Sequence, residues 1–400
     1  MLDLAINNVR LYPMTDDVTL SKHNSVGIQG GVIVSLEDQP QKAKVVMDGR
    51  QQVLLPGFID CHTHALYAGD RRNEYFKRMA GQSYEQIAKS GGGISNTVKA
   101  VREHTLEDLV EASLPRVQAL QREGVTTVEI KSGYGLDIET ELKMLRGIRA
   151  LDELCDANLV STFLGAHAIP TDNSADQYLN LVIDEMLPLV AKENLATAVD
   201  IFVEHIAFDV QHMECLFKAA RDLGFQVKAH AEQLSNSQAA QRAAAMGALS
   251  LDHLEYLDQP GIEAMAAHGT VAVMLPGAFY FLQETRRPPV EQLRRANVPM
   301  AVATDLNPGS SPIASLLTCI HMACNLFGLT PEECLLGVTI NGARALGAEA
   351  VIGSIDIGKQ ADLTLWRLEQ PQMLTYELGQ HRPTAVIKGG KLLNLGYTSC

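Results

Sequence analysis

Residues 52–64 read QVLLPGFIDCHTH. The run from Gln52 to Cys61 is mainly apolar, and it is followed at once by two histidines, His62 and His64. An apolar run of this length is typical of a strand that is buried on both faces of a parallel sheet. Because two histidines follow this predicted strand, the residues that follow any other strand of the same sheet are candidates for the same site.

Seven further runs of this kind occur along the chain, separated by longer amphipathic stretches rich in Ala, Leu, Glu and Arg. This alternation predicts parallel strands joined by helices, two of which are expected over residues 107–121 and 238–246. Eight strands fit a (β/α)8 TIM-type barrel better than an open sheet. The predicted strands are Gln52–Cys61, Thr126–Lys131, Ser161–Ala166, Val199–Val203, Gln226–Ala229, Leu249–Asp252, Thr270–Leu275 and Met300–Thr304.

The two ends of the chain have a different texture. Residues 1–53 and 353–395 consist of short alternating segments broken by Asn, Gly, Asp and Pro, which indicates small antiparallel strands. We therefore predict an α/β protein of two units. Residues 1–55 and 345–400 form a small β-sandwich domain, and residues 56–344 form the barrel.

The composition and charge of the chain exclude some classes of partner and location. The chain has 400 residues, of which 46% are hydrophobic, and its 33 basic and 47 acidic side chains give a formal net charge of −14. Such an acidic surface repels phosphate backbones, so we expect no nucleic-acid partner. The sequence has no evident signal peptide or membrane span, and its seven cysteines are scattered without a C-x-x-C pair. We expect a cytoplasmic protein with reduced thiols.

Polar residues follow most of the predicted strands. Residues two apart in an extended chain face the same way, so His62 and His64 can bind one metal ion. His230 and Asp305 can complete the site, because a barrel brings its strand ends to one mouth. Taken alone, each residue is better explained structurally, His230 as a core histidine and Asp305 as a turn or helix-capping residue, but together those explanations require several coincidences at one face of one barrel. Three imidazoles and one carboxylate suit zinc, iron or manganese.

Six longer stretches carry a family resemblance: Pro56–His64, Glu129–Gly135, Lys228–Gln233, Asp252–Tyr256, Leu275–Tyr280 and Ala303–Ser310. Together they resemble the amidohydrolase superfamily and, within it, the imidazolonepropionase family. The stretch at 353–363 also resembles the returning β-domain of the superfamily. The resemblance implies hydrolysis of the cyclic amide 4-imidazolone-5-propanoate to N-formimidoyl-L-glutamate in histidine degradation. It further implies one divalent ion, zinc or iron, on His62, His64, His230 and Asp305, and a homodimer.

The resemblance also implies which residues bind this small-molecule substrate. Arg71 matches the arginine that binds the propanoate group of the substrate in the family. A protein with a net negative charge must supply such a cation locally to bind an anionic substrate. The other matched substrate contacts are Tyr134, His167, Gln233, Asn307, Gly309 and Ser310. A packed loop aromatic remains the alternative for Tyr134, and an ordinary turn remains the alternative for residues 307–310.

Three residues are expected to take part in catalysis. The base that accepts a proton from water is Asp305, beside the ion, or His253. His253 can also polarise the carbonyl or carry a proton to the leaving nitrogen. An orienting role for His253 is equally open. Gln233 stands where some family members have Glu, and because an amide cannot move a proton, it can only orient water or substrate.

Lys131 ends the second predicted strand. Related amidohydrolases use a carboxylated lysine at a strand end to bridge two metal ions. We favour an unmodified lysine and a mononuclear site.

Two other functions stay open at this stage. The same fold could act on another cyclic amide or amidine, such as a nucleobase that is deaminated, although a neutral base does not need the cation at Arg71. A non-catalytic scaffold is less favoured, because all four proposed metal ligands are present.

Overall fold

The computed structural model describes residues 1–82 and 92–394. Its central feature is a sheet of eight strands in the order β7 to β14, with each strand parallel to its neighbours. The strands are β7 Phe58–Asp60, β8 Val125–Lys131, β9 Asn158–Ala166, β10 Ala198–Val203, β11 Gln226–Ala231, β12 Ser250–His253, β13 Val271–Met274 and β14 Met300–Val302. Each lies within or overlaps a predicted strand.

The first and last strands are joined just beyond their carboxyl ends. Thr63 and Leu306 form a parallel bridge, and the amide of Asp305 donates to the carbonyl of His62 at 3.0 Å. Beneath this bridge, the buried carboxylate of Asp60 accepts from the amide of Thr304 at 3.1 Å and from its hydroxyl at 2.6 Å. The predicted (β/α)8 TIM-type barrel is therefore confirmed, and the strand that precedes His62 and His64 lies beside the strand that precedes Asp305.

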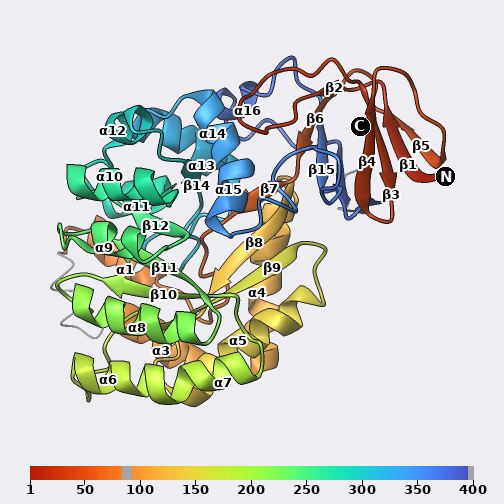
Figure 1. Ribbon diagram of the computed structural model, residues 1–400. Coiled ribbons are helices and arrows are strands. Elements are labelled where there is room, and N and C mark those ends of the chain that lie inside the picture. Colours follow the sequence, from red (N-terminus) through yellow and green to blue (C-terminus); the bar gives the residue numbers. More distant parts are fainter. Residues whose placement is uncertain (83–91, 395–400) are drawn as a thin grey trace.

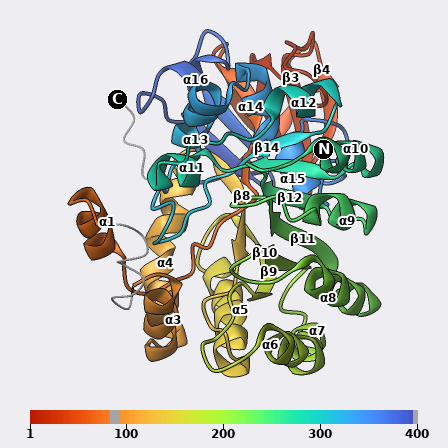
Figure 2. The same ribbon diagram turned by 90° about the vertical axis from the view of Figure 1, so that its left-hand side faces the viewer.

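Helices surround the barrel, as Figure 2 shows for α4, α5, α8, α9 and α10. The predicted helix at 107–121 is α4, which begins at Leu106 because Thr105 and Asp108 cap it reciprocally. The helices are α1 Arg72–Met79, α3 Ile94–Glu103, α4 Leu106–Gln121, α5 Ile138–Asp152, α6 Ala175–Leu181, α7 Leu187–Lys192, α8 Val210–Asp222, α9 Ala239–Ala245, α10 Gln259–His268, α11 Pro276–Leu282, α12 Val290–Arg295, α13 Leu316–Met322, α14 Pro331–Gly337, α15 Ile340–Ala345 and α16 Met373–Tyr376, with π-helical turns η1 Val182–Met186 and η2 Ala323–Phe327. Within the described residues no helix is long and apolar enough to cross a membrane.

The chain ends form two smaller sheets, one of N-terminal strands alone and one of strands from both ends, which lie side by side at one end of the molecule (Figure 1). Their orders are β4-β3-β1-β5 and β17-β16-β15-β6-β2. The strands are β1 Leu2–Asn7, β2 Arg10–Leu11, β3 Ser25–Gln29, β4 Val32–Glu37, β5 Ala43–Asp48, β6 Val53–Pro56, β15 Leu363–Trp366, β16 Ala385–Lys388 and β17 Lys391–Leu392. One apolar cluster, which includes Ile6, Ile28 and Leu363, joins the two sheets. This packing agrees with a sandwich, although β1–β5 and β2–β6 are parallel rather than antiparallel pairs.

The prediction of a single strand over 52–61 was wrong. That stretch divides into β6, which belongs to a chain-end sheet, and β7, which belongs to the barrel. Gly57 separates them where the chain passes close to Thr126, because a Cβ at position 57 would lie 2.2 Å from the Thr126 hydroxyl. The domain boundaries at 55/56 and 344/345 stay a prediction.

Candidate metal centre and active site

Four histidines lie together at the carboxyl ends of the barrel strands. His62 and His64 follow β7, His230 lies near the end of β11, and His253 ends β12. All four are at most 3% exposed. His253 and Asp305 have positive φ values of 83° and 51°, a conformation that is rare for non-glycine residues and common at functional sites.

The donor atoms of this cluster fit a metal ion. His62, His64 and His230 each offer a ring nitrogen within 4.8 Å of the other two. Among the described residues, each of them also has a buried ring nitrogen with no hydrogen-bond partner, which is costly unless a ligand satisfies it. Asp305 Oδ1 lies 3.4 Å from His62 Nε2 and 3.6 Å from His64 Nε2. The structure thus brings together all four residues predicted as ligands.

Two buried carboxylates orient two of the histidines. Asp252 Oδ2 lies 2.6 Å from His62 Nδ1, and Asp200 Oδ1 lies 3.1 Å from His230 Nδ1. A carboxylate that accepts from Nδ1–H leaves Nε2 with its lone pair, the form that binds metal. Burial, together with the charge of Lys131, lowers the pKa of His62 well below its usual range, which keeps the ring neutral. Neither aspartate stands out in the sequence as a functional residue.

Lys131 at the end of β8 has no exposed side-chain surface and makes ion pairs with buried carboxylates. Burial opposes its charge, but Asp200, Glu129 and Asp252 together raise its pKa well above the usual value. Carboxylation requires a neutral amine, so this environment favours the unmodified lysine expected from the sequence.

Arg71 precedes α1 and reaches the loop that follows β14. Its guanidinium donates to Glu74 at 2.7 and 2.9 Å, and a Cβ at Gly309 would lie 2.0 Å from Arg71 Nη1. Arg71, Gly309 and Ser310, which are all predicted substrate residues, therefore lie close together, since Ser310 follows Gly309 in the chain. Asn307 Oδ1 accepts from the amides of Gly309 and Ser310 at 2.8 and 2.7 Å. The side chain of Asn307 thus shapes this turn.

Tyr134 and His167 lie beside the histidine cluster. The ring of His64 is 5.7 Å from that of Tyr134 and 5.1 Å from that of His167. Burial lowers the pKa of His167 to about 3, so its ring is neutral. Gln233, in contrast, lies half-buried after β11, and its amide makes no hydrogen bond within the described part of the chain.

Glu255 is a buried acid that the sequence analysis missed. It lies two residues after His253, is 4% exposed, and has one oxygen with no hydrogen-bond partner in residues 1–82 and 92–394. Burial, with smaller effects from Glu284 and Asp305, raises its pKa to about 8. Two other acids after barrel strands are engaged by loops: Glu204 accepts from the amide of Leu234, and Glu232 from the amide of Ser237. Of these three acids, Glu255 alone has a carboxylate oxygen with no partner in the part of the chain that the structure describes.

A second arginine near Arg71 was also missed. Arg78 on α1 lies 4.4 Å from the ring centroid of Phe281, and its Nε and Nη2 atoms are buried with no hydrogen-bond partner in the described part of the chain. It lines a recess of about 30 Å³ together with Arg71 and Gly309. No local pattern distinguishes Arg78 from the other charged residues of α1.

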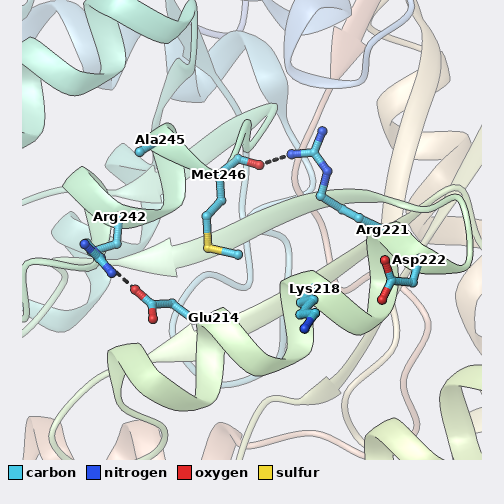
Figure 3. Close-up of a pocket in the computed structure, with 7 residues that line it drawn as sticks. All are labelled: Glu214, Lys218, Arg221, Asp222, Arg242, Ala245 and Met246. Atoms are coloured by element: carbon cyan, nitrogen blue, oxygen red, sulfur yellow. Dashed lines mark hydrogen bonds and ion pairs between the residues drawn. The ribbon is translucent and has the colours of Figure 1, made fainter.

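A wider depression of about 620 Å³ lies away from this mouth, between α8 and α9 (Figure 3). Its charged side chains are largely paired: Arg242 donates to Glu214 at 2.6 Å, and Arg221 donates to the carbonyl of Met246. None of the predicted site residues lines it.

Comparisons with known proteins agree with this geometry. Residues 53–393 match the model of the amidohydrolase family. An imidazolonepropionase of Shewanella baltica is 52% identical over 351 residues, 87% of this chain and 86% of the relative. An imidazolonepropionase of Shewanella denitrificans is 52% identical over 360 residues, 88% of this chain and 87% of the relative.

Solved structures match the fold at lower identity. A 5-methylcytosine deaminase from Klebsiella pneumoniae, bound to 5-fluorocytosine, has a TM-score of 0.76 at 19% identity, covering 99% of this chain and 98% of that chain. A zinc-bound adenosine deaminase from Xanthomonas campestris has a TM-score of 0.73 at 21% identity, covering 98% and 92%. The family model and the relatives together show that this chain belongs to the amidohydrolase family, and within it to the imidazolonepropionases.

Proposed function

We propose that this hydrolase converts 4-imidazolone-5-propanoate to N-formimidoyl-L-glutamate in histidine degradation. The observation that carries the proposal is the convergence of three buried histidines beside Asp305, each with a ring nitrogen that has no hydrogen-bond partner within the described residues. The relatives named imidazolonepropionase, 52% identical over most of the chain, supply the reaction.

His62, His64, His230 and Asp305 would hold one divalent ion, and zinc and iron both suit this donor set. When bound, such an ion supplies a Lewis acid that polarises a carbonyl and lowers the pKa of water. The side chains around it determine where the substrate lies and where protons move.

The reaction adds the oxygen of water to the ring carbonyl carbon and breaks the bond from that carbon to the ring nitrogen. One proton must therefore leave the water, and one must reach the departing nitrogen. The carboxylate of Asp305 is the proposed acceptor of the first proton. His253 is the proposed carrier of that proton from Asp305 to the departing nitrogen. Burial lowers its pKa, so its imidazole is neutral and can accept a proton before releasing it, and its Nδ1 has no hydrogen-bond partner among the described residues.

The propanoate group requires a cation at the mouth, and Arg71 is the proposed partner. Tyr134, His167, Asn307, Gly309 and Ser310 are the proposed lining of the same space. Gln233 would orient water or substrate through its amide. The homodimer and the cytoplasmic location stay predictions, and sedimentation analysis tests the first.

Hydrolysis of 4-imidazolone-5-propanoate by the purified chain tests the proposal directly. We expect turnover that is lost in a metal-stripped sample, restored by adding zinc or iron, and lost in His62→Ala. His268→Ala is the matched control, because that histidine is exposed at the end of α10. No turnover in a folded, metal-loaded sample would overturn the substrate assignment, and an assay for cytosine deamination would then examine the alternative reaction.

A further inference from the structure

The Lys131 ammonium lies among three carboxylates below the histidine cluster. Its Nζ is 2.7 Å from Asp200, 3.1 Å from Glu129 and 3.5 Å from Asp252. None of these side chains has exposed surface. Charges buried in this way must be paired, because leaving any of them alone in the interior is costly.

Two of these carboxylates also hold the proposed metal ligands. Asp252 bonds to His62 and Asp200 bonds to His230, each through Nδ1. Lys131 is therefore the cation shared by the two aspartates that orient the two histidines. Its position couples the two histidine–carboxylate pairs.

The third carboxylate has a cation of its own. Lys228 Nζ lies 2.8 and 2.9 Å from the two oxygens of Glu129, and the hydroxyl of Thr162 donates to the same carboxylate at 2.5 Å. Loss of Lys131 would thus leave Asp200 and Asp252 without an ammonium partner, while Glu129 keeps Lys228.

The atoms around Lys131 are themselves spaced like metal ligands. One atom each of Asp200, His230 and Asp252 lies within 4.8 Å of the other two. This second group shares His230 with the first group, and Lys131 lies in contact with both of its carboxylates. A cation position therefore exists beside the proposed metal centre, and a side chain of the protein fills it.

We propose that the Lys131 ammonium takes the place of a second divalent cation and so restricts this centre to one metal ion. The inference rests on the proposed function, because it presumes an ion on His62, His64, His230 and Asp305. Removal of the ammonium leaves two buried carboxylates and the space to accept a second ion.

Metal stoichiometry tests this inference without reference to activity. Wild type, Lys131→Ala and Lys131→Gln would be dialysed in Mn²⁺ buffer, their metal content measured, and their Mn²⁺ electron paramagnetic resonance spectra recorded. Lys131→Arg keeps a cation and is the matched control, and circular dichroism reports which variants fold.

We expect one ion per chain in the wild type and in Lys131→Arg. We expect two ions in Lys131→Ala or Lys131→Gln, with the spectrum of a spin-coupled Mn²⁺ pair. One ion in every folded variant would overturn this inference but not the proposed function. Two buried ions in the wild type would also overturn the inference, and this result does not depend on whether any variant folds. A wild-type chain that binds no ion would overturn the proposed function and the inference together.

Discussion

Asp252 accepts a hydrogen bond from His62 at 2.6 Å, although the two residues are 190 positions apart and neither side chain is exposed. A second bond, from the Ser250 hydroxyl at 2.7 Å, occupies the other carboxylate oxygen. The aspartate therefore has little freedom to turn, and it fixes which nitrogen of His62 faces the proposed ion.

Asp252→Asn should weaken metal binding. An amide oxygen is a poorer acceptor than a carboxylate, so the orientation and basicity of His62 should both suffer, with a loss of about 10–100-fold in metal affinity. Competition with a chelator of known affinity measures the change. Asp362→Asn is the matched control, because that buried aspartate pairs with Lys388 in a chain-end sheet. Equal affinities in the two variants would contradict an orienting role for Asp252.

Arg71→Met should raise KM more than it lowers kcat. A charge-assisted hydrogen bond contributes about 1.5–3 kcal/mol, so kcat/KM should fall roughly 10–150-fold. Arg72→Met is the control, because Arg72 is the next residue along the chain but is exposed and pairs with Asp70. If both variants lose activity equally, or neither does, Arg71 is not the propanoate partner.

The barrel and the ligand set could be predicted because both follow from local pattern. A strand buried on both faces is an apolar run, and the polar residue that ends it faces the mouth. The network below the mouth could not be predicted in this way. Lys131, Lys228 and Asp200 stand inside strand sequences, and their partners lie 69, 99 and 30 positions away. Only the barrel's strand order brings them together.

The break within residues 52–61 was missed for a similar reason. The residues on both sides of Gly57 are buried and apolar, so their hydrophobicity does not reveal that they belong to different sheets. The close approach of Thr126 requires glycine there, and that contact comes from another strand. Arg78 and Glu255 likewise look like ordinary charged residues in the sequence, and only the fold shows that Nε and Nη2 of Arg78 and one carboxylate oxygen of Glu255 are buried without a hydrogen-bond partner among the described residues.

Glu255 should make the stability of the metal-free chain depend on pH. Its pKa rises from 4.5 to about 8 on folding, so the folded state binds the proton more tightly than the unfolded state. This contribution to stability is full below pH 4.5 and is lost as the pH rises through about 8, with a limiting slope of roughly 1.4 kcal/mol per pH unit. Glu255→Gln should flatten the curve in this range.

Urea unfolding of the metal-stripped protein at a series of pH values measures this effect. Glu263→Gln on α10 is the control, because Glu263 is exposed and bonds to Gln259. Parallel stability curves for wild type and Glu255→Gln between pH 4.5 and 8 would show that the acid is not held protonated by burial.

Gly309→Ala should act on the substrate through Arg71. The added methyl would lie 2.0 Å from Arg71 Nη1, a distance at which one of the two groups must move, and the long arginine side chain moves more easily than the turn fixed by Asn307. We expect KM to rise about tenfold, as for an effect near 1.4 kcal/mol, with metal content unchanged.

A double-mutant cycle separates this cause from a general disturbance of the loop, because on an Arg71→Met background the methyl has no guanidinium to displace. The substitution should then change KM by less than twofold. If Gly309→Ala raises KM equally in both backgrounds, the effect belongs to the turn itself, and Arg71 does not mediate it.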